Sequence, residues 1–238
     1  MTDYFNWVGQ GMDDFRPTGI DDADGLIPVN PAIEAYMRNL VIRTDHPVLF
    51  EMEELARQEN FPIVNRLVGV FLKTQASMIN AKRVFEFGSG FGYSAYWFAK
   101  AIGHDGRVIC SDSDAANRQR AKKYLSAAEL WQCVEFHVGL AQDVFEQTDG
   151  LFDICYNDVD KSAYPEIWQI AKHRIRSGGL YIADNVLWHG RVAVKNYQDE
   201  IDVSTAAIVE HNQMIFNDPD FDVFINPIRD GVMVARKK

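Results

Sequence analysis

The sequence predicts one α/β domain built around a doubly wound, mostly parallel sheet, and three observations carry this prediction. From residue 83 onward, short apolar runs alternate with stretches of helical periodicity, the pattern expected of right-handed βαβ units. The 238 residues are 47% apolar, which is enough for one core, and α/β domains of this size commonly stay undivided. Asp230-Gly231 joins two apolar runs at the end of the chain, a hairpin signal that predicts one antiparallel C-terminal strand.

The same periodicity places the strands and the helices between them. Strands are expected over residues 83–87, 107–111, 134–138, 152–156, 179–183, 221–226 and 232–236. Helices are expected over residues 93–102, 114–127, 141–146, 163–173 and 200–216. Ahead of this core (83–238), residues 30–80 predict three further helices, which begin at Asn30-Pro31, after Pro47 and after Pro62. Residues 1–28 are acidic and rich in turn residues, so we expect an irregular arm there.

The charge and the cysteine content indicate which class of partner the protein binds and in which cellular compartment it works. The formal net charge of -10 disfavours nucleic acid and anionic membrane surfaces, because both select basic proteins, and a small-molecule partner fits better. The three cysteines are odd in number and show no metal-binding or redox spacing. The sequence shows neither a signal-peptide pattern nor an apolar run of the roughly 18 to 20 residues that a membrane span needs. We therefore expect a cytoplasmic protein with reduced cysteines.

A glycine-rich turn follows the first strand of the core. An apolar run meets Gly88, Gly90 and Gly92, and a helical pattern begins at Tyr93. Glycine permits positive φ and lets a ligand approach the main chain closely, so the turn fits a nucleotide-like ligand, although it also fits a plain tight turn. Glu86 narrows the choice, because a carboxylate at the strand end disfavours a pyrophosphate and favours a ligand with a cationic group.

Acidic residues follow three of the predicted strands, and ligands of doubly wound sheets bind beyond such strand ends. Asp112 ends the second strand, where an acid can accept hydrogen bonds from a ribose diol; the alternative is a helix cap, which Asp114 fits better. Asp158 follows the fourth strand and Asp184-Asn185 the fifth. Their hard oxygen atoms suit Mg²⁺, Ca²⁺ or Mn²⁺, although each residue taken singly also fits a turn or cap. Adjacent strand residues point to opposite faces, so Asp184 and Asn185 can share one ion only if the strand bends there.

These motifs together resemble a known family. Glu86, Gly88, Gly90 and Gly92 form an ExGxGxG pattern similar to the first motif of class I S-adenosylmethionine (SAM) dependent methyltransferases. The following Tyr93-Ser94 narrows the resemblance to the catechol and caffeoyl-CoA O-methyltransferase group, and residues 157–161 and 184–185 resemble that group's DADK and DN motifs. The resemblance covers roughly residues 60–238. It implies a seven-stranded Rossmann-like fold, a homodimer and cation-dependent O-methylation.

The resemblance also implies roles for individual residues. It implies SAM contacts at Glu86, Gly88, Ser89, Ser94, Asp112, Ala141, Asp160 and Val64. It implies a divalent cation, Mg²⁺ first and Ca²⁺ or Mn²⁺ as alternatives, held by Asp158, Asp184 and Asn185. It implies that Lys161 is the general base, since its protonated form is disfavoured beside a divalent cation.

The segment after Asn185 reads VLWHGRV, and the resemblance implies that Trp188 and His189 line the acceptor pocket. Core packing for Trp188, and a polar loop position or a metal ligand for His189, are the alternatives. The implied acceptor is a small catechol-like, vicinal-diol or enol compound whose two oxygens chelate the ion.

Two other functions stay open at this point. An NAD-type oxidoreductase would use the same glycine turn, but Glu86 and the lack of a recognisable hydride-transfer centre count against it. A non-enzymatic binding protein that keeps the fold is the second, and the intact set Asp158, Asp184, Asn185 and Lys161 counts against that.

Overall fold

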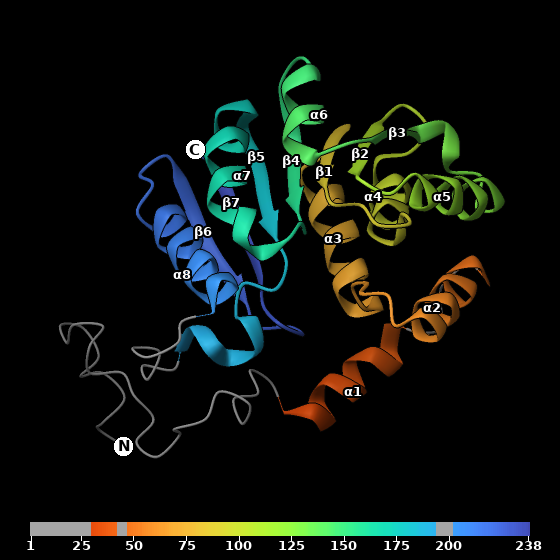
Figure 1. The fold of residues 1–238 in the computed structure, drawn as a ribbon, viewed down its shortest axis with the longest axis horizontal. Coiled ribbons are helices and arrows are strands. Elements are labelled where there is room, and N and C mark those ends of the chain that lie inside the picture. The colour runs from red at the N-terminus through yellow and green to blue at the C-terminus, as the bar shows by residue number, and fades with distance from the viewer. Residues whose placement is uncertain (1–29, 42–46, 194–201) are drawn as a thin grey trace.

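The computed structural model of the chain describes residues 30–41, 47–193 and 202–238, and its centre is one seven-stranded sheet (Figure 1). The strands are β1 (Arg83–Phe87), β2 (Arg107–Asp112), β3 (Val134–Val138), β4 (Phe152–Asn157), β5 (Ile175–Ala183), β6 (Phe221–Asn226) and β7 (Val232–Lys237). Their order is β3-β2-β1-β4-β5-β7-β6. The first five strands pair in parallel, and β7 pairs antiparallel with both β5 and β6. The predicted fold class, including the antiparallel C-terminal strand, is confirmed.

Helices cover both faces of this sheet (Figure 1). They are α1 (Pro31–Val41), α2 (Pro47–Glu59), α3 (Arg66–Met78), α4 (Tyr93–Ile102), α5 (Ala115–Ala127), α6 (Ala141–Gln147), α7 (Tyr164–Ala171) and α8 (Val203–Phe216). Helices α2 to α5 pack on one face and α6 to α8 on the other, the arrangement of a doubly wound sheet. None of these helices, nor any other within the described ranges, is long and apolar enough to cross a membrane.

The central strands are apolar on both sides because both sides are covered. In β1, Val84 contributes to the core beneath α3 to α5, whereas Phe85 and Phe87 contribute to the core beneath α6 to α8. Phe85 meets Phe145 of α6 edge to face, with ring centroids 4.8 Å apart. This two-sided burial explains why the strand reads as a continuous apolar run and not as an alternating one. Glu86 is the polar exception in it.

Most element boundaries lie within three residues of the predicted ones, and three places differ more clearly. Strand β5 begins at Ile175 and not at residue 179, because the sheet accommodates Gly178 (φ 74) through a register shift opposite Phe152. The predicted helix over 163–173 is divided into η5 (Lys161–Ala163), α7 and η6 (Lys172–Arg174). The C-terminal hairpin is closed by residues 227–231 and not by a two-residue turn at Asp230-Gly231. The predicted arm, residues 1–28, lies outside the described residues.

Candidate active site

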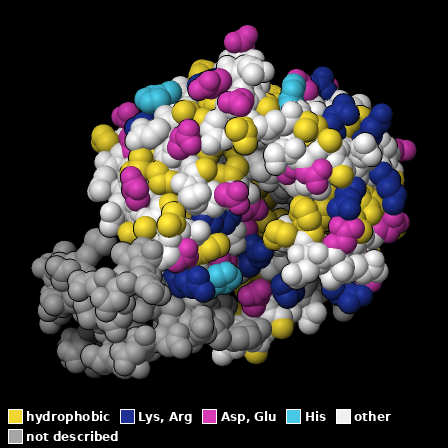
Figure 2. All heavy atoms as spheres, in the orientation of Figure 1, with side chains coloured by type: hydrophobic (Ala, Val, Ile, Leu, Met, Phe, Trp, Pro, Cys, Tyr) yellow, Lys and Arg dark blue, Asp and Glu magenta, His cyan; other side chains and the backbone are white. Residues whose placement is uncertain are grey.

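A cavity of about 800 Å³ opens at the carboxyl ends of the parallel strands. Its walls come from the glycine turn after β1, the end of β2, and the loops after β3, β4 and β5. Since β1 lies between β2 and β4, the cavity sits where the strand order reverses, the usual ligand position in doubly wound sheets. The surface is hollowed near the middle of this face, where acidic and basic side chains meet (Figure 2).

The glycine turn is set by close contact between two backbone segments. Gly88 has φ 79, and a Cβ atom there would lie 2.6 Å from the carbonyl oxygen of Asp158. The Gly88 amide donates to the carbonyl of Ser111 on β2. Gly92, with φ 87, is the N-cap of α4, which begins at Tyr93. Only glycine combines a positive φ with this closeness at Gly88, so the turn brings the loop after β4 directly against the loop after β1.

Asp112 braces this turn from the end of β2. Its Oδ2 accepts from the Gly90 amide at 2.9 Å, and its Oδ1 accepts from the Asn117 side chain at 3.0 Å. The helix cap is a different residue, Asp114, whose Oδ1 accepts from the Ala116 amide at 2.8 Å. Asp112 itself lines the cavity. Asp114 is therefore the helix cap, whereas Asp112 braces the glycine turn and faces the cavity.

The remaining residues predicted to contact SAM line the cavity, with one exception. The cavity is lined by Gly88, Ser89, Ser94, Asp112, Ala141, Asp160 and Val64. Glu86 is fully buried behind the turn and is not among the described lining residues. Its carboxylate accepts from the Ser94 hydroxyl and from Cys110 Sγ. Burial raises the pKa of Glu86 to about 7, although the Ser94 hydrogen bond opposes that rise. Glu86 therefore hydrogen-bonds to a cavity-lining residue, Ser94, and its own side chain does not line the cavity.

Lys161 is held at the other end of the cavity by two partners. Its Nζ donates to Asp158 Oδ1 and to the Tyr164 hydroxyl, both at 2.8 Å. The Tyr164 hydroxyl donates in turn to the backbone carbonyl of Asp184 at 2.8 Å. Burial raises the pKa of Tyr164 well above its ordinary value, so the phenol stays protonated and keeps donating. Tyr164 therefore ties the loop after β4 to the end of β5.

The chain bends immediately after β5, as a shared ion would require. The strand ends at Ala183, and Asn185 takes the left-handed conformation with φ 57. Asn185 lines the cavity, and its Nδ2 donates to Asp230 Oδ2 at 3.2 Å, which leaves its Oδ1 as an acceptor.

Asp184 is fully buried beneath Arg229. Its Oδ2 lies 2.6 Å from Arg229 Nη1, whereas its Oδ1 has no hydrogen-bond partner among the described residues. Burial raises the pKa of Asp184 to about 7, and the Arg229 guanidinium opposes that rise. Arg229 lines the cavity and Asp184 does not appear in its described lining.

The oxygen atoms here are of the chemical kind that a hard cation binds. Asp158 and Asp184 follow neighbouring strands and are close enough for each charge to act on the other. Within the part of the chain that the structure describes, no three His, Cys, Asp or Glu side chains gather as a metal site, so a third protein ligand would be the Asn185 amide. The unpaired Oδ1 of Asp184 is the kind of buried acceptor that a bound cation satisfies.

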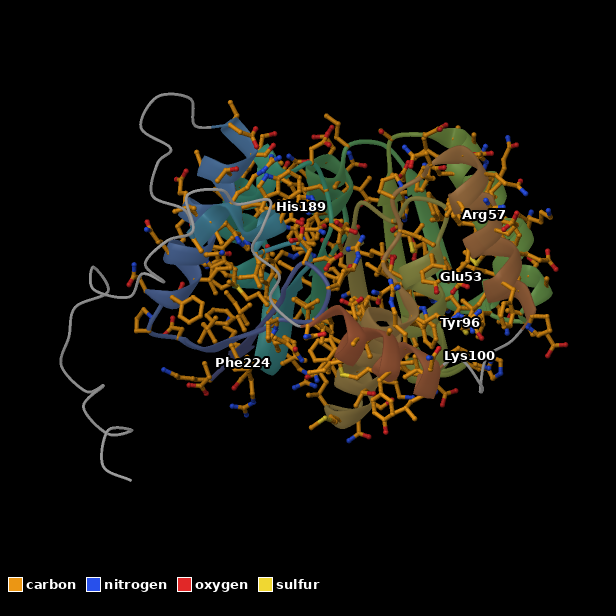
Figure 3. The ribbon with its side chains drawn as sticks, turned by 90° about the horizontal axis from the view of Figure 1, so that it is seen from below. Glu53, Arg57, Tyr96, Lys100, His189 and Phe224 are labelled. Atoms are coloured by element: carbon orange, nitrogen blue, oxygen red, sulfur yellow. The ribbon has the colours of Figure 1, made fainter. Side chains whose placement is uncertain are left out.

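Trp188 and His189 form one wall of the cavity. Both take positive φ, 45 and 56, and their rings lie 5.3 Å apart between centroids. Trp188 is half-buried, and its Nε1 donates to Asp202 Oδ2 at 3.3 Å. The His189 amide donates to Asp230 Oδ1, and its side chain is exposed (His189 is labelled in Figure 3). Both residues line the cavity, and Trp188 also packs against the core beneath α6 to α8.

The sequence does not predict the part that three residues play in the site. Tyr164 lies three residues after Lys161, a helical spacing that could have suggested contact. The sequence pattern indicates only a turn at Asp230, yet its carboxylate accepts hydrogen bonds from both Asn185 and His189. Arg229 pairs with Asp184 across 45 residues of sequence, and no local pattern signals such a pairing.

Comparison with known proteins identifies the family. The O-methyltransferase family profile matches residues 39–238. A catechol O-methyltransferase of Niastella koreensis is 32% identical over 170 residues, 69% of this chain and 77% of that protein. Caffeoyl-CoA O-methyltransferase 2 of Populus trichocarpa is 28% identical over 205 residues, 79% of this chain and 80% of that protein. The O-methyltransferase of Bacillus cereus, solved in complex with SAH, has a TM-score of 0.77 and 25% identity over 87% of this chain and 97% of that chain. The strand order, the glycine turn and the family match agree, and the chain belongs to the O-methyltransferase family.

Proposed function

We propose that the protein transfers the methyl group of SAM to a hydroxyl oxygen of a small acceptor that carries two adjacent oxygens, such as a catechol, a vicinal diol or an enol. The observation that carries this proposal is that one cavity joins the glycine turn to Lys161, Asp158 and Asn185. Methyl transfer needs a cofactor and a proton acceptor side by side, and a cavity with this lining would hold both.

The cofactor end would be built by the glycine turn and the residues around it. The Asp112 carboxylate would accept from the ribose diol, Gly88 and Ser89 would allow the close approach, and Ser94 would contact the amino acid end in front of Glu86. Ala141, Asp160 and Val64 complete this part of the wall. When bound, SAM supplies an electrophilic methyl group on a positively charged sulfur. That chemistry is supported by the family and by the SAH complex of the Bacillus cereus protein.

At the acceptor end, Lys161 would take the proton of the attacking hydroxyl. Its Nζ is already fixed by Asp158 and Tyr164, so little reorganisation is needed when the acceptor binds. Asp158, Asp184 and Asn185 would hold a divalent cation, which supplies positive charge next to the hydroxyl oxygen and lowers the hydroxyl pKa. Mg²⁺ suits these ligands first, with Ca²⁺ or Mn²⁺ as alternatives.

The acceptor would lie between the side chains of Trp188 and His189 and the acid loop. An aromatic ring is the natural partner for the half-buried Trp188, which favours catechol-like acceptors. The catechol and caffeoyl-CoA enzymes among the relatives also act on oxygen atoms of aromatic compounds. The homodimer stays a prediction from family resemblance.

The experiment is a methyl-transfer screen over diol-bearing compounds with SAM, run with added divalent ion and again with a chelator. We expect turnover of at least one catechol or enol that stops in chelator and returns with Mg²⁺. Full activity in chelator would reject the cation. Thermal protection by SAH but not by NAD separates this function from an oxidoreductase, and unchanged function in Asp158→Ala would favour a non-enzymatic role.

A further inference from the structure

Arg229 lies between the cavity and a carboxylate proposed to bind the divalent ion. It belongs to the connection from β6 to β7, with φ 51, and its side chain is 28% exposed while that of Asp184 is 0% exposed. Its Nη1 lies 2.6 Å from Asp184 Oδ2, and its Nη2 donates to the carbonyl of Ile63 at 3.0 Å. The guanidinium therefore covers Asp184 and is itself held from two sides.

We infer that Arg229 is a built-in cation that occupies the predicted ion site, so that a divalent ion gains Asp184 only by displacing the guanidinium. This inference rests on the proposed function, because it concerns the ion proposed there. It adds a residue that sets the affinity of the site for metal.

The local charge balance supports competition. The two proposed ligand carboxylates, Asp158 and Asp184, are each already paired with one cation of the chain, Lys161 and Arg229. A divalent ion added to this set would meet two positive charges at short range and carboxylates that are already neutralised. An ion on the unpaired Asp184 Oδ1 would meet the guanidinium that holds Oδ2, and the repulsion between the two cations requires Arg229 to move away in this case too.

Arg229 can relieve this repulsion only by moving. An arginine guanidinium keeps its proton throughout the usable pH range, so loss of charge is not a route to metal binding. Movement is possible because Arg229 borders the open cavity, whereas Asp184 is enclosed. The metal affinity should therefore include the free energy of breaking the contacts of Arg229 to Asp184 and to Ile63.

The test is direct Mn²⁺ binding, followed by electron paramagnetic resonance, to the intact protein without SAM or acceptor. Arg229→Gln removes the charge and should bind Mn²⁺ at least tenfold more tightly than the unaltered chain. Arg229→Lys keeps a charge and should stay within about threefold of it. Asp184→Asn should lose the site in either background.

A matched control exists at the opposite end of β4 and β5, the two strands that Asp158 and Asp184 follow. Arg176 pairs with Asp153 through Nε and reaches the carbonyl of Ile79 through Nη2, so it bridges a strand carboxylate and an N-terminal backbone carbonyl as Arg229 does. Arg176→Gln should leave Mn²⁺ affinity unchanged. If Arg176→Gln raises the Mn²⁺ affinity as much as Arg229→Gln does, the gain comes from the loss of any positive charge, and the inference about Arg229 is wrong.

A second measurement, thermal unfolding with and without Mn²⁺, checks that the variant folds and that the ion stabilises it. Without metal, Arg229→Gln leaves the buried Asp184 unpaired and should lower the thermal midpoint, and Mn²⁺ should raise that midpoint more in this variant than in the unaltered chain. Equal Mn²⁺ affinity in the two folded proteins overturns the role of Arg229 and leaves the proposed function standing. Absence of Mn²⁺ binding in both proteins, with SAH binding intact, overturns the proposed ion and this inference together.

Discussion

The ammonium group of Lys161 lies 2.8 Å from the hydroxyl of Tyr164, and that hydroxyl is anchored on the backbone carbonyl of Asp184. Lys161 is thus fixed to two strand ends, because its other partner is Asp158 after β4. Its side chain is only 10% exposed, so its position depends on these partners and not on solvent. Tyr164 is a positioning residue for the proposed base.

Removing the Tyr164 hydroxyl should slow methyl transfer without weakening cofactor binding. Tyr164→Phe takes one net hydrogen bond from Lys161, for which we expect a three- to tenfold fall in kcat, roughly 0.5 to 1.5 kcal/mol. The KM for SAM should not change. Tyr156→Phe is the control, because the Tyr156 hydroxyl is buried and has no hydrogen-bond partner within the described ranges. A merely structural role for Tyr164 would lower the thermal midpoint and leave kcat of the folded enzyme unaltered.

Lys161→Met should nearly abolish turnover while the protein still binds SAH. Loss of a positioned general base typically costs about 10²- to 10⁴-fold in rate, and methionine keeps the length of the side chain. The residual rate should rise with pH, since solvent hydroxide then takes the proton. Lys172→Met is the comparison, because Lys172 also pairs with an aspartate, Asp218, at 3.0 Å but lies away from the cavity. Retention of more than a tenth of the activity in Lys161→Met would assign the base to another group.

Variants of the neighbouring acids Asp112 and Asp114 should have different effects, because we expect Asp112 to bind the cofactor and Asp114 caps a helix. Asp112→Asn removes a charged acceptor from the proposed ribose site and should weaken SAH binding about tenfold or more, as measured by calorimetry. Asp114→Asn should leave both SAH affinity and stability nearly unchanged, since asparagine caps a helix as well as aspartate does. Equal losses in the two variants would indicate a general effect of acidity in this loop.

His211 should make the fold sensitive to acid. It is fully buried, and burial lowers the pKa of His211 from 6.5 to about 4. Because the folded state holds the neutral ring, its contribution to stability is complete above about pH 6.5 and is lost as the pH falls toward 4. The loss should approach about 3 kcal/mol in the free energy of unfolding.

Denaturant unfolding between pH 7 and 4 checks this prediction by comparing variants. His211→Gln should show a shallower loss of stability with acid, whereas His137→Gln, at an exposed histidine, should follow the unaltered chain. Glu86 and Asp184 take up protons in the same range with the opposite sign, so the difference between variants is the informative quantity. Parallel curves for all three proteins would contradict the role of His211.

Local patterns in the sequence were enough for the architecture. The apolar run of β1, the glycines after it and the cap at Asp114 act over a few residues, and the structure places β1 and the cap as predicted. The start of β5 was misplaced because Gly178-Gly179 indicate a turn by themselves, whereas strand pairing with β4 draws them into the sheet. Tertiary pairing, which no window of sequence contains, decided that boundary.

The candidate site also contains residues that the sequence could place and residues that it could not. Asp112, Asp158 and Asn185 could be placed from the rule that ligands bind beyond strand ends, and all three line the cavity. The burial of Asp184 under Arg229 could not, because it depends on how a hairpin 45 residues later folds back over β5. Glu86 shows the same limit, since its carboxylate is at the predicted strand but faces Ser94 instead of open space.

The contact between Gly88 and the carbonyl of Asp158 leaves no space for even a methyl group. The separation between the cofactor turn and the acid loop is therefore fixed by main-chain sterics and does not adjust to the molecule that is methylated. Under the proposed function, new acceptors would be accommodated at the rim formed by Trp188 and His189, which line the same cavity. Such a scaffold would diversify its substrates by exchanging rim residues while the reaction geometry stays the same.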